Sequence, residues 1–225
     1  MTRFALLAIV ALAGCGLGPE IREQVHQTLP ATSAPAVRLS NVVGTIRVKP
    51  WNRNAVDVQA VKTGHSMDDL NRMTIDARSQ GGNVIIATKY GGGRGGGVDY
   101  TLLVPAGASV AIDNVTGTVD IVGVLGNVSA TTQTGEIRVQ LGRVAGNRVV
   151  DLGATTGSVT LSIARDSSAR VNAGSTVGSF STDFAGISRS QTNVVGVVAS
   201  GNIGTGSAAI RLHATTGSIA LRALR

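Results

Sequence analysis

The sequence predicts an all-β fold, a single-stranded β-solenoid built from stacked coils of about 20 residues each. The first observation is a short unit, Thr-Thr-Gly-Ser-Val-Thr-Leu at Thr155–Leu161, which returns as Thr-Thr-Gly-Ser-Ile-Ala-Leu at Thr215–Leu221. The second is the alternation of apolar residues after the glycine of each copy, which is typical of a strand with one buried face. Looser copies of the unit begin at Val43, Thr116, Thr134 and Val177.

The composition favours a narrow core. The 225 residues suffice for one domain, and 43% of them are hydrophobic, but only 3% are aromatic and 30 are glycines. A core filled by Val, Ile, Leu and Ala, with glycine wherever the backbone must turn, suits such a composition. A broad globular core, which depends on large side chains, is disfavoured.

The net charge of +7 arises from 20 basic and 13 acidic residues. Such an excess attracts anionic partners, for instance acidic glycans or lipid headgroups. The arginines are nevertheless scattered singly along the sequence, without a basic stripe interleaved with aromatic residues. We therefore expect no nucleic-acid binding and interpret the charge as a mildly basic, solvated surface.

The N-terminus has the features of a lipoprotein signal. Arg3 precedes the apolar run Phe4–Ala13, which is too short to span about 30 Å of hydrocarbon as a helix and suits a secretory signal. The next residues, Leu12-Ala13-Gly14-Cys15, resemble the lipobox of bacterial lipoproteins. This resemblance implies cleavage before Cys15 and lipidation of that cysteine.

Two further features bear on this assignment. Cys15 is the only cysteine, so no disulfide can form within the chain. Gly16 follows it, which by resemblance to lipoproteins of diderm bacteria favours the outer membrane of the cell envelope, on its periplasmic or its surface side. The alternative is an ordinary secreted protein with a stray cysteine.

We expect three segments along the chain. They are a signal peptide at residues 1–14, a lipidated cysteine with a flexible tether at residues 15–35, and a β-solenoid domain at residues 36–225. The tether is predicted because Gly18, Pro19, Pro30 and Pro35 interrupt it, although Ile21–Leu29 has room for a turn or two of helix. The domain divides into an irregular part, residues 36–107, and a part with regular repeats, residues 108–225.

The irregular part is expected to combine strands with one short helix. Apolar residues alternate along residues 37–48, 56–62, 74–77 and 83–88, which predicts strands. Ser66 followed by Asp68 and Asp69 is typical of a helix N-terminus, so a short helix should extend to about Met73. Metal binding is the alternative role for the two aspartates, but helix capping explains both. The run Gly91–Gly97 superficially resembles a calcium-binding repeat, but a single copy favours a hairpin loop.

In the regular part, glycines mark the expected corners between strands. Because neighbouring coils lie about 4.8 Å apart, like residues should lie over like. A ladder of hydroxyl groups is then expected beside the corners, and Arg222 with Arg225 suggests a charged last coil that discourages end-to-end association. The corner glycines are Gly117, Gly135, Gly157, Gly178, Gly201 and Gly217, and the ladder comprises Thr116, Thr134, Thr156 and Thr216.

Several of these stretches resemble the bacterial DUF4097-type family of adhesin-like β-solenoid domains, a family of unknown function. The resemblance covers about residues 37–224. It is carried by Leu39–Val48 with Trp51, by Val56–Ala60, by Tyr100–Gly107 and by the later Thr-Gly repeats. It implies an envelope protein without known catalytic residues.

Three functions compete. The first is a non-enzymatic, lipid-anchored scaffold or binding surface, a monomer held at the membrane by the lipid on Cys15, with an envelope glycan or a protein as partner. The second is an envelope stress or signalling lipoprotein that acts through a protein partner. The third is a polysaccharide-active enzyme, which needs clustered carboxylates on one face.

The distribution of reactive side chains argues against an enzyme. His26, His65 and His213 are isolated in the sequence, with His26 in the expected tether and His213 at an outward strand position. No cluster of histidine and cysteine has metal-ligand spacing. We therefore expect no catalytic residue, no cofactor and no metal site. The carboxylates that an enzyme of this fold would use are thinly spread, and those to test are Asp113, Asp120, Glu136 and Asp151.

Overall fold

The computed structural model describes residues 9–12, 20–92, 95–192 and 196–224. Within these ranges, fifteen strands hydrogen-bond into one sheet, accompanied by a single helix. The elements are β1 (Ile9–Leu12), β2 (Glu20–Pro30), β3 (Ala36–Val43), β4 (Ile46–Trp51), β5 (Ala55–Gly64), α1 (Met67–Asn71), β6 (Met73–Gln80), β7 (Asn83–Tyr90), β8 (Gly97–Pro105), β9 (Ser109–Val122), β10 (Val128–Gln140), β11 (Val149–Ile163), β12 (Ala169–Thr182), β13 (Ile187–Thr192), β14 (Gly196–Ile203) and β15 (Ala208–Ala223).

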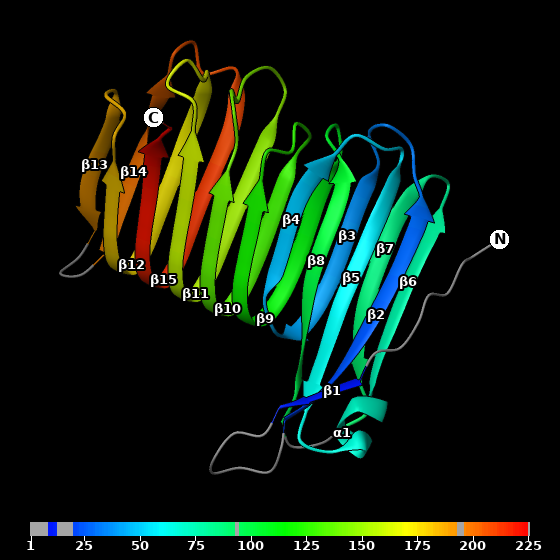
Figure 1. The fold of residues 1–225 in the computed structure, drawn as a ribbon. Coiled ribbons are helices and arrows are strands. Elements are labelled where there is room, and N and C mark those ends of the chain that lie inside the picture. Colours follow the sequence, from blue (N-terminus) through cyan, green and yellow to red (C-terminus); the bar gives the residue numbers. More distant parts are fainter. Residues whose placement is uncertain (1–8, 13–19, 93–94, 193–195, 225) are drawn as a thin grey trace.

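The sheet folds over on itself into two layers with the core between them (Figure 1). Each long strand runs along one layer, turns at a glycine and returns along the other layer. In β9, Val110 and Ile112 are buried before Gly117, and Val119 and Ile121 are buried after it. The buried positions change from even to odd numbers at the corner because both segments must face the same core. We call the segment before the glycine the first limb and the segment after it the second limb.

Six such coils stack in parallel, which confirms the predicted all-β solenoid. One coil consists of β3 and β4, and the others are β9, β10, β11, β15 and β12 in spatial order. The register places equivalent residues over one another, so that Ile137 lies opposite Val119 and Val159. The predicted threonine ladder is present in the same register, since Thr134 pairs with Thr116 and Thr156, and Thr156 pairs with Thr216.

The corner glycines form a column in which the backbones of neighbouring coils touch. Gly117, Gly135 and Gly157 have φ angles of 130°, 145° and 142°, a region that residues with side chains rarely adopt. A Cβ on Gly157 would also overlap the carbonyl oxygen of Gly135 in the next coil, and the same relation recurs from Gly117 to Gly44 and from Gly217 to Gly157. The corner therefore requires glycine both for its backbone conformation and for the close stacking of coils.

The irregular part closes one end of the stack. Here β8, β5 and β2 extend the layer of second limbs, while β7 and β6 extend the layer of first limbs. The predicted helix is confirmed as α1, in which the Ser66 side chain accepts a hydrogen bond from the Asp69 N–H at 3.1 Å. The described strands β7 and β8 do not form the hairpin expected around Gly91–Gly97, because β7 pairs with β3 in the layer of first limbs and β8 pairs with β4 in the layer of second limbs.

The flexible tether predicted for residues 15–35 is wrong for residues 20–30. These residues form β2, which pairs antiparallel with β5 from Ile21 opposite Gly64 to Pro30 opposite Ala55. The apolar residues Ile21, Val25 and Leu29 are four positions apart, a spacing that suits a helix as well as a strand. The free edge of β5 decides in favour of the strand, and Leu29 is buried there.

Two predictions about the C-terminal part are also wrong. The last strand, β15, pairs with β11 and β12 and so lies inside the stack rather than at its end. Its Arg222 donates to Asp183 Oδ1 at 3.1 Å, whereas Arg225 lies outside the described residues. Gly201 is no corner, because it lies within β14 and pairs antiparallel with Val171 and Ile187. The hairpin of β13 and β14 has the same apolar alternation as a coil, so spacing alone could not distinguish them.

Gly157→Ala should lower the free energy of unfolding by about 3 kcal/mol, because it adds backbone strain and a steric overlap in the middle of the stack. The matched control is Gly142→Ala, in the loop after β10, where an added Cβ would meet no atom within 4 Å. Urea unfolding followed by circular dichroism measures both variants. Equal losses of stability would contradict the packing described for the glycine column.

Candidate functional site

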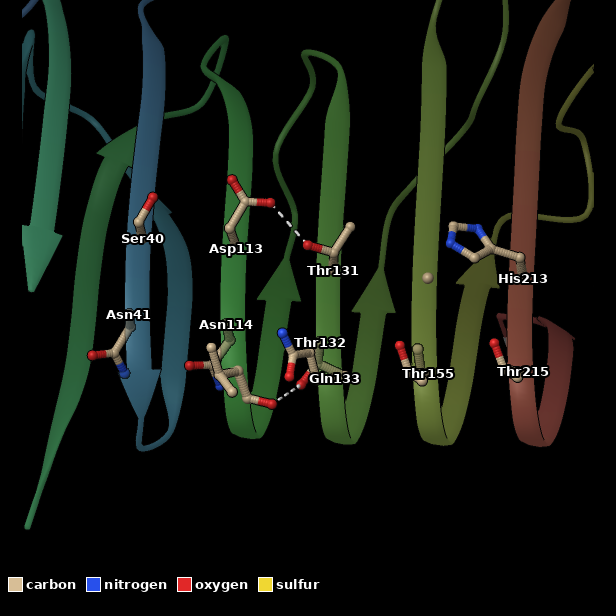
Figure 2. Close-up of a pocket in the computed structure, with 13 residues that line it drawn as sticks. Ser40, Asn41, Asp113, Asn114, Thr131, Thr132, Gln133, Thr155, His213 and Thr215 are labelled. Atoms are coloured by element: carbon tan, nitrogen blue, oxygen red, sulfur yellow. Dashed lines mark hydrogen bonds between the residues drawn. The ribbon is translucent and has the colours of Figure 1, made fainter. Parts of the chain in front are cut away.

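The outer side of the first limbs carries a hollow of about 560 Å³ that extends over β3, β9, β10, β11 and β15 (Figure 2). The register brings its residues together, since neighbouring strands contribute residues at equivalent positions. Along one line across the strands, each residue pairs with the next in the order Ser40, Asp113, Thr131, Gly153 and His213. We call these five residues the polar row.

The centre of the polar row combines a carboxylate with a space left by glycine. Thr131 Oγ1 donates to Asp113 Oδ1 at 2.8 Å. On the next strand, Gly153 has no side chain, and the imidazole of His213 lies over it, where a Cβ would overlap the ring. Figure 2 shows the ring of His213 directed from β15 toward β11. Because the His213 side chain remains 61% exposed, it presents a planar surface to a ligand in the hollow.

A second hollow of about 320 Å³ adjoins the first on the same layer, one pair of residues farther from the corner. Arg38, Ser129 and Asp151 line it. Asp151 connects the two hollows, since its carboxylate lies 3.9 Å from His213 Nδ1 and 4.0 Å from an Arg211 nitrogen. Charged residues of both signs border the two hollows, since Asp113 and Asp151 are acidic and Arg38 and Arg211 are basic.

The carboxylates considered for an enzyme lie on opposite sides of the molecule. Asp113 and Asp151 project from first limbs, whereas Asp120 and Glu136 project from second limbs, with the core between the layers. A glycosidase needs two carboxyl groups about 5–10 Å apart on either side of one bond. The described residues also contain no group of three or more His, Cys, Asp or Glu side chains arranged to hold a metal ion.

One polar cluster was missed by sequence reasoning. His26 on β2 hydrogen-bonds through Nε2 to Asp57 Oδ1 on β5 at 2.7 Å, and Thr28 Oγ1 donates to the same oxygen at 2.7 Å. Gln59 donates to the other carboxylate oxygen at 2.9 Å. The prediction that His26 is isolated in a tether is therefore wrong. No short-range signal could have found this cluster, because His26 and Asp57 meet only through the pairing of β2 with β5.

This cluster fastens β2 to the sheet. The Asp57 side chain is only 7% exposed, and burial alone would raise its pKa. Hydrogen bonds from Thr28, His26 and Gln59 outweigh burial, so that the pKa of Asp57 lies below its usual value of 3.8. Asp57 is consequently ionised at neutral pH, with its charge held by three neighbouring donors.

The acidic pair at α1 has the structural role predicted for it. Asp69 donates its backbone N–H to the side chain of the N-cap Ser66, and its carboxylate accepts a hydrogen bond from the His65 N–H at 3.1 Å. Asp68 accepts from Arg72, one turn along the helix, at 2.6 Å. Both carboxylates are thus engaged within the helix and its N-terminal turn.

The predicted lipidation site, Cys15, lies outside the described residues, as does most of the expected signal peptide. Within that peptide, Ile9–Leu12 form β1, which pairs antiparallel with β2. In the part of the chain that the structure describes, no helix has both the length and the apolar character needed to cross a membrane.

Comparison with known families supports the assignment of the fold. The sequence model of the family Toastrack DUF4097 matches residues 104–222, more than half of the chain. The chain belongs to this family. The match begins at the end of β8 and covers the five long strands of the stack. The resemblance noted in the sequence is therefore confirmed.

Two solved structures are similar to this Toastrack protein. A presumed cell adhesion protein from Clostridium sporogenes has 11% sequence identity and a TM-score of 0.64, with 90% of this chain and 100% of that chain covered. A presumed adhesin from Bacteroides fragilis has 10% identity and a TM-score of 0.33, with 88% and 96% covered. The first similarity supports the β-solenoid fold. Among curated proteins, no match to the chain was found.

Asp57→Asn should lower stability at neutral pH and flatten its dependence on acid. Because the folded-state pKa of Asp57 is depressed, its stabilisation is present above the unfolded-state pKa of about 3.9 and is lost as pH falls through the folded-state pKa. Urea unfolding between pH 2 and pH 7 measures the effect. Asp76→Asn, at an exposed pair with Arg78, is the control that should keep the wild-type pH profile. If the stability of Asp57→Asn depended on pH in the same way as that of the wild type, the lowered pKa assigned to Asp57 would be refuted.

Proposed function

We propose that this Toastrack protein is a non-enzymatic, lipid-anchored protein of the cell envelope whose polar row binds an uncharged glycan. The observation that carries the proposal is the alignment of the five polar-row residues across five strands, over a hollow of about 560 Å³. Such a surface binds its ligand through hydrogen bonds and contacts, and it does not need a pair of catalytic carboxylates.

The chemistry of the hollow favours hydroxyl and amide groups over charged ones. Of the described residues that line it, Asp113 is the only carboxylate and none is lysine or arginine, so a polyanion is disfavoured. A sugar hydroxyl can donate to Asp113, and an acetamido group can pair with Thr131 or Gln133. Neighbouring strands lie about 4.8 Å apart, which is close to the length of one sugar unit in an extended glycan chain. Successive sugars of a chain laid across the strands would therefore contact equivalent positions on successive strands.

The proposed anchor is the lipid on Cys15. Its support is the succession of a basic start, a short apolar run and small residues before the cysteine. Two or more acyl chains hold a protein on a bilayer far more firmly than one. Among the described residues no helix could substitute for such an anchor.

Gly153→Val should abolish most glycan binding while leaving the fold intact. The valine suits a strand, fills the hollow and displaces His213 from its position over residue 153. Binding of N-acetylglucosamine oligomers, measured by calorimetry, should weaken at least about tenfold, which corresponds to roughly 1.4 kcal/mol.

The matched control is Gly174→Ala, on the other side of His213, where a Cβ meets its nearest atom at 3.7 Å. It should bind the oligomers as the wild type does. Equal binding by all three proteins would remove the polar row as the site. No binding by the wild type would overturn the choice of glycan.

Cys15→Ala should release the protein from the membrane fraction and prevent labelling by a clickable palmitate analogue. Protease treatment of intact cells then shows on which side of the envelope the wild-type domain lies. If the variant is retained and labelled as the wild type is, Cys15 is not the anchor.

A further inference from the structure

We infer that the end of the solenoid carrying α1 rests against the lipid surface, so that the domain lies on its own membrane instead of projecting from it. This inference rests on the proposed lipidation of Cys15. It adds an interaction surface, the α1 end, defined as the first residues of β2, the last residues of β5 and α1. Its partner is the bilayer to which the chain is attached.

The length of chain available between anchor and fold is the first argument. The sheet begins at Glu20, the first residue of β2. Five residue steps separate Cys15 from Glu20, and even fully extended they span at most about 17 Å. The flexible tether of about 20 residues expected from the sequence would instead have allowed roughly 25 Å on average and a far longer maximum. The domain must therefore remain close to the headgroups.

The position of Glu20 on the molecule is the second argument. Ile21 pairs with Gly64, the last residue of β5, and α1 follows directly and contacts β2. Figure 1 shows the start of β2 and α1 together at one end, beyond the line of corners. Met67 of α1 is 48% exposed there. An anchor on Cys15 consequently brings this end of the molecule, and the apolar Met67 side chain, nearest to the bilayer.

The opposite edge must then face away from the lipid. The second limbs run from the corners to this edge, where they end in loops. Leu125, in the loop between β9 and β10, is 64% exposed. Trp51, at the end of β4, lies at the same edge and donates through Nε1 to the Ala55 carbonyl at 2.7 Å.

The charges at the α1 end are compensated locally. Ion pairs join Arg22 to Glu20 at 2.9 Å, Lys62 to Glu23 at 3.2 Å and Arg72 to Asp68 at 2.6 Å. Among the described residues, this end therefore has no net basic patch that would hold it on anionic lipids by electrostatics. The attached lipid has to supply the attraction, so membrane association should be insensitive to salt and absent without the lipid.

The short connection limits the distance from the membrane at which the domain can bind a ligand. A domain held this way can bind chains that lie within its own envelope, next to the membrane. It is poorly placed to bridge to a distant surface. Adhesion between cells would require a longer connection than the five residue steps between Cys15 and Glu20 provide.

Tryptophan quenching in vesicles tests the inference. The lipidated mature protein, which begins at Cys15, is reconstituted into phosphatidylethanolamine–phosphatidylglycerol vesicles that contain brominated phosphatidylcholine. Met67→Trp and Leu125→Trp are compared on the wild-type background, in which Trp51 contributes equally to both. Both positions are exposed, so each variant should fold. We expect several-fold stronger quenching of the added tryptophan at position 67 than at position 125, unchanged by high salt.

A second variant tests whether the short connection to Cys15 is what holds the α1 end against the bilayer. Inserting 20 Gly and Ser residues between Pro19 and Glu20 should reduce the quenching at position 67 while flotation with the vesicles is retained. Equal quenching at positions 67 and 125 in floating protein would overturn the orientation but leave the lipid anchor standing. Failure of the wild type to float with the vesicles would overturn both the anchor and the orientation.

Discussion

The backbones of neighbouring coils touch at the glycine corners, and this contact determines how the two layers of strands align. Each corner glycine lies against the carbonyl of the glycine in the neighbouring coil, in a conformation that side chains disfavour. This contact sets the register of both limbs at once, since Gly135 opposite Gly117 and Gly157 brings Ile137 opposite Val119 and Val159. A shift by one residue would turn the apolar residues outward in both layers. A narrow core without many aromatic side chains is then sufficient.

The same register creates the face that we assign to binding. Successive residues of the polar row are 18 to 73 positions apart in the sequence, and they become neighbours because their coils stack in phase. The face combines one carboxylate, hydroxyl groups and a ring over a glycine. Such a set can recognise a polar chain by hydrogen bonds. The carboxylates on the other layer are separated from this face by the core, and therefore belong to a different surface.

The N-terminal strand alters the relation between the domain and its proposed anchor. Because β2 completes the layer next to β5, held by Leu29 in the core and by the bonds from His26 and Thr28 to Asp57, the chain that could serve as a spacer is short. A strand that stabilises one end of the solenoid thus also determines how far the solenoid can move from a membrane. The same eleven residues, Glu20–Pro30, thus affect both the stability of the solenoid and its distance from the membrane.

Local patterns in the sequence were enough to predict the coils with glycine corners, the threonine ladder, and α1 with its Ser66 cap. Each depends on residues close together in the chain, or on a repeat that aligns only one way. Tertiary structure alone decided that β15 inserts between β11 and β12, that Gly201 belongs to a hairpin, and that β2 joins the sheet. The physical reason is that similar coils and open strand edges offer nearly equivalent partners. The choice among them depends on long-range packing and not on any local pattern.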